Sequence, residues 1–167
     1  MTHEESYPIK AAVKHMSHTN VAVMDQFGTL HVDTVKADRL LVPTNKGLGS
    51  TPPPVSGTVD HYTCYKVKIT KGMTAFPKDV QATVQTQFDT RLYDVKKPKH
   101  LCTPVNKNGE GVTSMIAHLM CYQVKAARGE LPHVKVIGTI QTRNQFGTGR
   151  LDTIKEDELC VPAQKHP

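Results

Sequence analysis

Residues 87–90 read Gln-Phe-Asp-Thr, and the variant Gln-Phe-Gly-Thr occupies residues 26–29 and 145–148. Without any gap, each copy is followed by an acid six positions after the phenylalanine, a lysine nine after it, a leucine thirteen after it and a proline sixteen after it. Self-similarity of this kind indicates a chain built from copies of one structural unit. The acids are Asp33, Asp94 and Asp152, and the lysines are Lys36, Lys97 and Lys155.

The first half of the unit recurs as well. Residues 61–68 (HYTCYKVK) align with residues 118–125 (HLMCYQVK), and residues 3–10 (HEESYPIK) keep the same frame. These copies divide the chain into three β units at residues 1–46, 59–109 and 110–167. Residues 47–58, between the first two units, are rich in proline and glycine, which is typical of a linker.

Each unit has the pattern of short β-strands. Residues 65–69 and 122–125 alternate between apolar and polar side chains, and residues 80–87 and 134–142 are rich in β-branched residues. The latter two segments lead into the Gln-Phe turn, which predicts a β-hairpin. We expect an all-β fold of three internal repeats with about four short strands each. Two arrangements fit: a β-trefoil-like body with pseudo-threefold symmetry, or a row of small β modules packed on one another.

The repeat also decides how the four cysteines pair. Cys64 and Cys121 occupy one repeat position, and Cys102 and Cys160 occupy another. The first unit has Ser6 and Leu41 at these positions, so it lacks both partners together, as a bonded pair predicts. The predicted disulfides are Cys64–Cys102 and Cys121–Cys160. Each is worth about 4 kcal/mol in the chain-entropy model, and both favour a location outside the reducing cytosol.

Composition and charge exclude several classes of protein. The 167 residues carry a formal charge of +6, but no nucleic-acid-binding motif accompanies it, so we expect no nucleic-acid partner. No apolar run is long enough to span a membrane. Met1 leads directly into polar residues with no signal peptide, so for an exported protein we expect the mature form.

The sequence also lacks the usual motifs of catalysis and metal binding. It contains no Gly-x-Ser-x-Gly, no His-Glu-x-x-His and no glycine-rich phosphate loop. No two cysteines are closer than nineteen positions, whereas zinc sites usually use close cysteine pairs. We therefore expect a protein that is not an enzyme, with no catalytic residue, no metal site and no cofactor.

Positions kept in all three units serve either the shared scaffold or a ligand site that is present three times. We expect Phe27, Phe88 and Phe146 to anchor the core, because aromatic residues are few. The repeated tyrosines, glutamines and acids either bond to strand edges and turns or form a polar pocket for carbohydrate or a cation. These candidate ligand-binding residues are Tyr7, Tyr65, Tyr122, Gln26, Gln87, Gln145, Asp33, Asp94 and Asp152.

Several of these segments together resemble an uncharacterised family of secreted bacterial repeat proteins. The resemblance lies in residues 64–68 (CYKVK), 93–99 (YDVKKPK) and 101–109 (LCTPVNKNG), and extends to residues 119–122 (LMCY) and 159–162 (LCVP). It covers nearly the whole chain. It implies export, disulfide bonds and a bacterial surface, periplasmic or extracellular setting, but it carries no activity. The first unit departs from the family pattern by lacking both cysteines.

These observations favour a non-enzymatic extracellular structural or adhesive protein, a self-associating subunit of a surface layer or fibre. Its partner would then be a second copy of itself. One alternative is a lectin-like module that binds an extracellular polysaccharide. Another is a secreted hydrolase whose site has no recognisable motif.

Overall fold

The structure is a computed structural model that describes residues 3–57 and 59–166, and its regular elements are all β-strands. The strands are β1 (His3–Pro8), β2 (Val21–Asp25), β3 (Gly28–Leu48), β4 (His61–Ile69), β5 (Val80–Gln85), β6 (Thr90–Val105), β7 (His118–Ala126), β8 (Ile140–Asn144), β9 (Gly147–Leu151) and β10 (Glu158–His166). The all-β prediction is confirmed. Within these two ranges there is no helix that could cross a membrane.

Two strands are much longer than the sequence predicts. β3 has 21 residues and β6 has 16, because each runs on where two short strands were expected. Both contain irregular register shifts, at residues 34–39 in β3 and 95–100 in β6. Such bulges bend a strand without ending it. The prediction of four short strands is therefore wrong for the first two units, which have three, and only the third unit has four.

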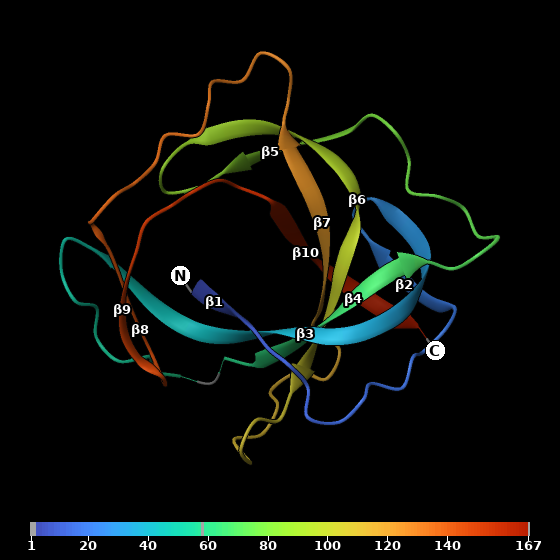
Figure 1. Cartoon of the computed structure of the whole chain (residues 1–167), viewed down its shortest axis with the longest axis horizontal. Coiled ribbons are helices and arrows are strands. Elements are labelled where there is room, and N and C mark those ends of the chain that lie inside the picture. Colours follow the sequence, from blue (N-terminus) through green and yellow to red (C-terminus); the bar gives the residue numbers. More distant parts are fainter. Residues whose placement is uncertain (1–2, 58, 167) are drawn as a thin grey trace.

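Six of the strands close on themselves. The hydrogen-bonded order is β2-β10-β7-β6-β4-β3, and β2 also pairs with β3, so each of these strands has two neighbours. All of these pairings are antiparallel. Figure 1 shows the strands curling around a common centre, with β10 passing behind β7. The remaining strands extend this closed sheet: β1 pairs with β3, β5 with β6, and the β8–β9 hairpin with the end of β3.

One face of the closed sheet carries the main core. Full burial of a large apolar side chain contributes roughly 1.5–3 kcal/mol, and here the buried side chains come from every unit. They are Val23, Leu30, Val32, Val67, Tyr93, Val95, Leu101, Met120, Tyr122, Val124, Val161 and Ala163. The three units therefore depend on one another for this core.

The two predicted disulfides are confirmed. Cys64–Cys102 joins β4 to β6, and Cys121–Cys160 joins β7 to β10. In each bond the two cysteines lie directly opposite each other in the ladder. Ser6 and Leu41, their counterparts in the first unit, also lie directly opposite each other, on β1 and β3. Three of the cysteines, Cys64, Cys102 and Cys121, form a second buried cluster with Tyr62, and Leu41 and Leu119 pack against it.

The phenylalanines do not all serve as core anchors. Phe27 packs against the main core, but Phe88 is 42% exposed and Phe146 is 61% exposed, so the prediction is wrong for these two. Phe146 lies at the tip of the β8–β9 hairpin, which pairs with the end of β3 outside the closed sheet. Phe88 lies at the β5–β6 turn, where Lys46 Nζ is 5.1 Å from the ring centre.

The proline-rich segment is bound to its neighbours. β3 runs two residues into the predicted linker, to Leu48. Asn45 Nδ2 donates to the carbonyl oxygens of Pro53 and Pro54, and Thr51 Oγ1 donates to Gln141 on β8. The segment therefore packs along β3 and β8. Residues 134–139, also expected to be strand, form none; β8 begins at Ile140.

Candidate functional site

The three repeated tyrosines occupy three different environments. Tyr122 is buried in the main core and donates a hydrogen bond to Asp25 Oδ2 at 2.6 Å; burial and this acid raise the pKa of its hydroxyl. Tyr7 accepts a hydrogen bond from Asn144 Nδ2 at 2.8 Å and lines a hollow of only about 60 Å³. Tyr65 faces a cavity of about 390 Å³. Of the three, Tyr65 has room beside it for a ligand.

Each of the repeated acids already accepts a hydrogen bond from another residue of the chain. Asp33 accepts from Thr70 Oγ1 at 2.7 Å and from the Asn20 amide at 3.0 Å, and the Thr70 bond is the main reason that its pKa is lowered. Asp94 accepts from Gln81 Nε2, and Asp152 from a backbone amide. Asp33 forms an ion pair with Lys68, and Asp94 forms one with Lys96, so these partners are not the repeated Lys36 and Lys97.

The repeated glutamines lie apart from these tyrosines and acids. Gln87 is exposed at the β5–β6 turn. Gln26 borders an open hollow beside the ends of β7 and β10, and Gln145 borders a cavity next to His61. The tyrosine, glutamine and acid of one unit therefore do not converge, and three equivalent pockets of these residues do not form.

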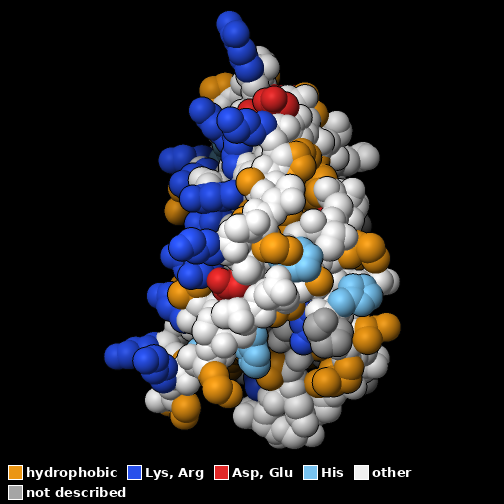
Figure 2. All heavy atoms as spheres, turned by 90° about the vertical axis from the view of Figure 1, so that its right-hand side faces the viewer, with side chains coloured by type: hydrophobic (Ala, Val, Ile, Leu, Met, Phe, Trp, Pro, Cys, Tyr) orange, Lys and Arg blue, Asp and Glu red, His pale blue; other side chains and the backbone are white. Residues whose placement is uncertain are grey.

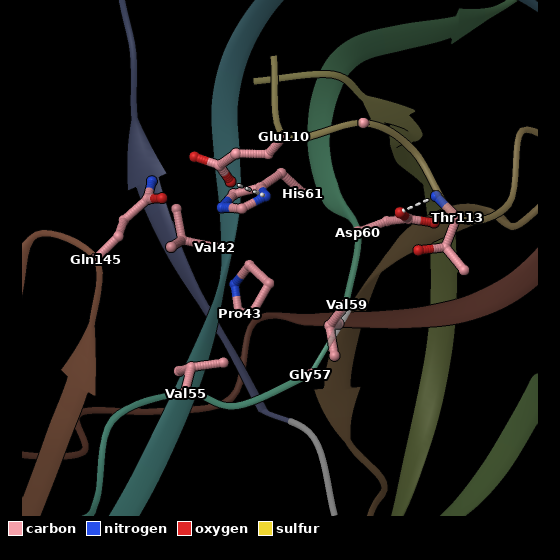
Figure 3. A pocket seen from close by; sticks show the side chains of 11 residues that line it. Val42, Pro43, Val55, Gly57, Val59, Asp60, His61, Glu110, Thr113 and Gln145 are labelled. Carbon is pink, nitrogen blue, oxygen red and sulfur yellow. Dashed lines mark hydrogen bonds and ion pairs between the residues drawn. The ribbon is translucent and has the colours of Figure 1, made fainter. Parts of the chain in front are cut away.

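The cavity next to His61 has a volume of about 250 Å³ (Figure 3). His61 and Glu110 point toward each other, with Nδ1 and Oε2 3.7 Å apart. Glu110 also accepts a hydrogen bond from Lys107, which lowers the pKa of its carboxyl group. Asp60 is bonded to the amides of Thr113 and Ser114. These polar groups already have partners, and the contacts tie the loop after β6 to the start of β4.

The cavity beside Tyr65, which we call the Tyr65 cavity, opens at one end of the closed sheet. It is lined by His15, His18, Val21, Thr34, Tyr65, Leu101, Thr103, Lys165 and His166. Its side chains come from β2, β3, β4, β6 and β10 and from the segment between β1 and β2. Of these lining residues, only Tyr65 was predicted from the sequence as a candidate ligand-binding residue. Most of the others do not occupy positions that are kept in all three units. In the described part of the chain, no group of three or more histidine, cysteine or acidic side chains could hold a metal ion.

A buried histidine that does not line the Tyr65 cavity links all three units. His100 on β6 lies between Glu158 on β10, with Nδ1 and Oε2 2.8 Å apart, and Asp38 on β3, with Nε2 and Oδ1 3.1 Å apart. Burial opposes ionisation of Glu158, but the hydrogen bond and positive charge of His100 lower its pKa overall. Both ring nitrogens face carboxylates, so neither is free to take a proton from a substrate. This arrangement is a structural link.

The loops of the third unit expose several large apolar side chains. Leu131, Val134, Ile137 and Ile154 are each between 66% and 78% exposed. They lie in the loops on either side of the β8–β9 hairpin, which pairs with residues 45–48 of β3, beyond the residues of β3 that pair with β4. These loops therefore add an apolar surface at the edge of the molecule.

Together these features define a disulfide-bonded, all-β repeat protein. The model of a family described as a repeat of unknown function (DUF7450) matches residues 3–162, and the chain belongs to that family. A search of curated proteins and a search of solved structures gave no match.

Proposed function

We propose that the chain is a non-enzymatic extracellular protein with a structural or adhesive role, whose copies associate head to tail. One observation carries the proposal. In the first and third units, the second strand pairs with the strand end that follows the repeated proline of the other unit. The second strand of the second unit has no such partner among the described residues. The two disulfides agree with an oxidising, extracellular setting.

The last strand of the first unit pairs with the second strand of the third unit, and the last strand of the third unit pairs with the second strand of the first. The end of β10 pairs with β2, where Gln164 lies opposite Met24. The end of β3 pairs with β8, where Asn45 lies opposite Arg143. Asn45 and Gln164 are the same repeat position, two residues after the repeated proline, and Met24 and Arg143 are both three residues before the repeated phenylalanine. Relative to the repeat, the two pairings therefore have the same register.

In the described part of the chain, the second unit lacks this pairing. Its second strand, β5, pairs only with β6 among the described residues. The matching residues after Pro104 form a turn in which the Glu110 amide donates to the Lys107 carbonyl. In the shared register, Asn106 would lie opposite Gln85. In Figure 1, β5 lies at the top and the yellow turn after β6 at the bottom, so the pair must form between copies.

The free edge of β5 is suited to strand addition. Its sequence, Val-Gln-Ala-Thr-Val-Gln, has no charged residue and no proline, the features with which proteins commonly protect exposed edges. Because the edge and the segment that would fill it lie at opposite ends, each added copy presents a new free edge. A head-to-tail contact of this kind builds a filament or a layer unless it closes into a ring.

Two variants, each with one cysteine added to the four that form disulfides, test the register. We expect Gln85→Cys protein mixed with Asn106→Cys protein to form a disulfide-linked heterodimer on oxidation, because the two positions would lie directly opposite each other. Peptide mass mapping would identify the 85–106 bond. Sedimentation of the unmodified protein should show a mean mass that rises with concentration.

The matched control is Gln123→Cys, which is exposed on β7, a strand with neighbours on both sides. It should not cross-link to Asn106→Cys. A protein that stays monomeric at its highest soluble concentration contradicts the proposed self-association. A protein that associates without an 85–106 bond contradicts this register alone.

A further inference from the structure

We infer that the Tyr65 cavity binds an acidic sugar residue of an extracellular polysaccharide, with the ring against Tyr65 and the carboxylate at Lys165. This inference is independent of self-association, because β5 and the turn after β6 do not line the cavity.

The walls of the cavity continue the main core of the closed sheet. Thr34 and Thr103 each lie two residues after a core residue, Val32 and Leu101. Lys165 lies two residues after the core residue Ala163, and Tyr65 lies two residues before the core residue Val67. Side chains two apart on a strand share a face, so these four line the continuation of the core where it opens to solvent. Regular strands thus hold the polar groups in place.

The segment between β1 and β2 closes one side of the cavity and is itself held in place. His15 Nε2 is 2.8 Å from Thr34 Oγ1, and the His18 amide donates to the same oxygen at 2.9 Å. The Thr34 amide in turn donates to the His18 carbonyl. The His15 ring centre is 4.8 Å from that of Tyr65, so two aromatic rings form one wall. A site already formed in the free protein loses less entropy on binding.

The lining favours an anion. Lys165 and three imidazoles, of His15, His18 and His166, border the cavity, and no aspartate or glutamate is among the lining residues. Figure 2 shows lysine and arginine side chains gathered in a band along one side of the molecule, with few acidic side chains among them. Together with the charge of +6, such a band attracts polyanions in general. The cavity adds a specific place for one acidic group.

The uncharged lining favours a sugar over a bare anion. Val21, Leu101 and the Tyr65 ring offer apolar surface to the C–H face of a sugar, and the hydroxyl of Thr103 can bond to one of its hydroxyls. A volume of about 390 Å³ lies within the range of roughly 300–1,000 Å³ common for small-molecule sites. A simple anion would leave most of this lining without contact.

Titration of the whole chain with D-glucuronate, D-glucose and acetate, followed by amide NMR, tests the inference. Glucuronate should give saturable shifts at Thr34, Tyr65, Thr103 and Lys165. Glucose lacks the carboxylate and acetate lacks the ring, so each should bind at least about tenfold more weakly, the effect of losing one good contact. Acetate that binds as tightly as glucuronate would reduce the site to a general anion site and overturn the inference.

Lys165→Met keeps the apolar stem of the lysine and removes its charge. It should weaken glucuronate binding at least about tenfold and leave glucose binding unchanged. Lys78→Met, an exposed lysine that does not line the cavity, is the matched control and should bind as the unmodified protein does. Equal losses in the two variants would point to overall charge, and no saturable glucuronate binding at all would reject the site.

Discussion

At the scale of single residues, the hydrogen bond from Tyr122 to Asp25 joins the third unit to the first inside the core. The Tyr122 ring packs against Phe27 and Phe76, with ring centres 5.3 and 4.9 Å away. Tyr122→Phe keeps this packing but removes the donor from a carboxylate oxygen. We expect the free energy of unfolding to fall by about 1 kcal/mol, the usual net contribution of one hydrogen bond, because Asp25 is only partly buried and water can replace the lost donor. Urea denaturation measures the change.

Tyr62→Phe provides the comparison, since Tyr62 is also buried but lies beside the disulfide cysteines. Its loss of stability should be the smaller of the two. Equal losses would mean that the bond to Asp25 adds nothing beyond what any buried tyrosine hydroxyl contributes.

The sequence predicts hydrogen-bonding roles better than burial. Asp33 and Asp152 each accept a hydrogen bond from a backbone amide, of Asn20 and of Gly138, in line with the interpretation that these acids bond to strand edges and turns. By contrast, Tyr7, Tyr65 and Tyr122 share one repeat position, yet the first lines a small hollow, the second a cavity, and the third lies in the core. The difference arises from how the units meet, which the sequence of a single unit does not contain.

At the scale of elements, β1 and β3 offer a place for a third cross-link. Ser6 and Leu41 lie opposite each other as the bonded cysteines do in the other units. The double variant Ser6→Cys/Leu41→Cys should therefore form a disulfide without backbone rearrangement. A loop of this size stabilises a protein by about 2–4 kcal/mol, partly offset here by the lost Leu41 packing.

Thiol titration and thermal unfolding under oxidising conditions measure the outcome, with Ser6→Cys alone as control. A fully oxidised double variant that unfolds more readily than the unmodified chain would contradict the expected gain. Two free thiols in the double variant would contradict the register of β1 on β3.

Strand positions were predictable where apolar and polar side chains alternate within one unit. Alternation in residues 65–69 and 122–125 foretold the cores of β4 and β7, and the apolar residues of 80–87 foretold β5. The continuous β3 and β6 were not foreseen, because a bulge has no clear signature in a single sequence. Of residues 134–142, which were predicted to be strand, only 140–142 are strand, at the start of β8. The third hairpin pairs with the end of β3, which leaves Val134 and Ile137 exposed before it.

At the scale of the whole molecule, closure of the sheet depends on contacts far apart in the sequence. The repeat implied that every unit contributes alike, but only β2 and β8 pair with the end of a strand from another unit, β10 and β3 respectively, while their counterpart β5 pairs with β6 alone among the described residues. Alternation and turn residues act over a few positions, so they could not select which unit pairs with which. The disulfides were predictable because two copies of one unit could be compared with a third.

The folded molecule as a whole should lose stability in acid. Folding lowers the pKa of six carboxyl groups: Asp33, Asp60, Asp94, Glu110, Glu156 and Glu158. A side-chain hydrogen bond is the main cause for Asp33, Asp94 and Glu110. For the other three, burial raises the pKa, but hydrogen bonds and positive charges together outweigh it. Partial burial and Asp60 raise the pKa of Glu4 to about 7, an opposing effect limited by the exposure of that side chain.

A carboxyl group with a lowered pKa in the folded state stabilises the protein above its unfolded pKa and loses that contribution as the pH falls through its folded pKa. The unfolded values are 3.8 for aspartate and 4.5 for glutamate. Urea unfolding at pH 7, 5, 4 and 3 should therefore show stability falling mainly below about pH 4.5. Glu158→Gln should cost up to about 1 kcal/mol at pH 7, after solvent screening. The difference between the variant and the unmodified protein should shrink as the pH falls through the lowered pKa of Glu158, whereas a constant difference at every pH would mean that Glu158 acts through packing and not through its charge.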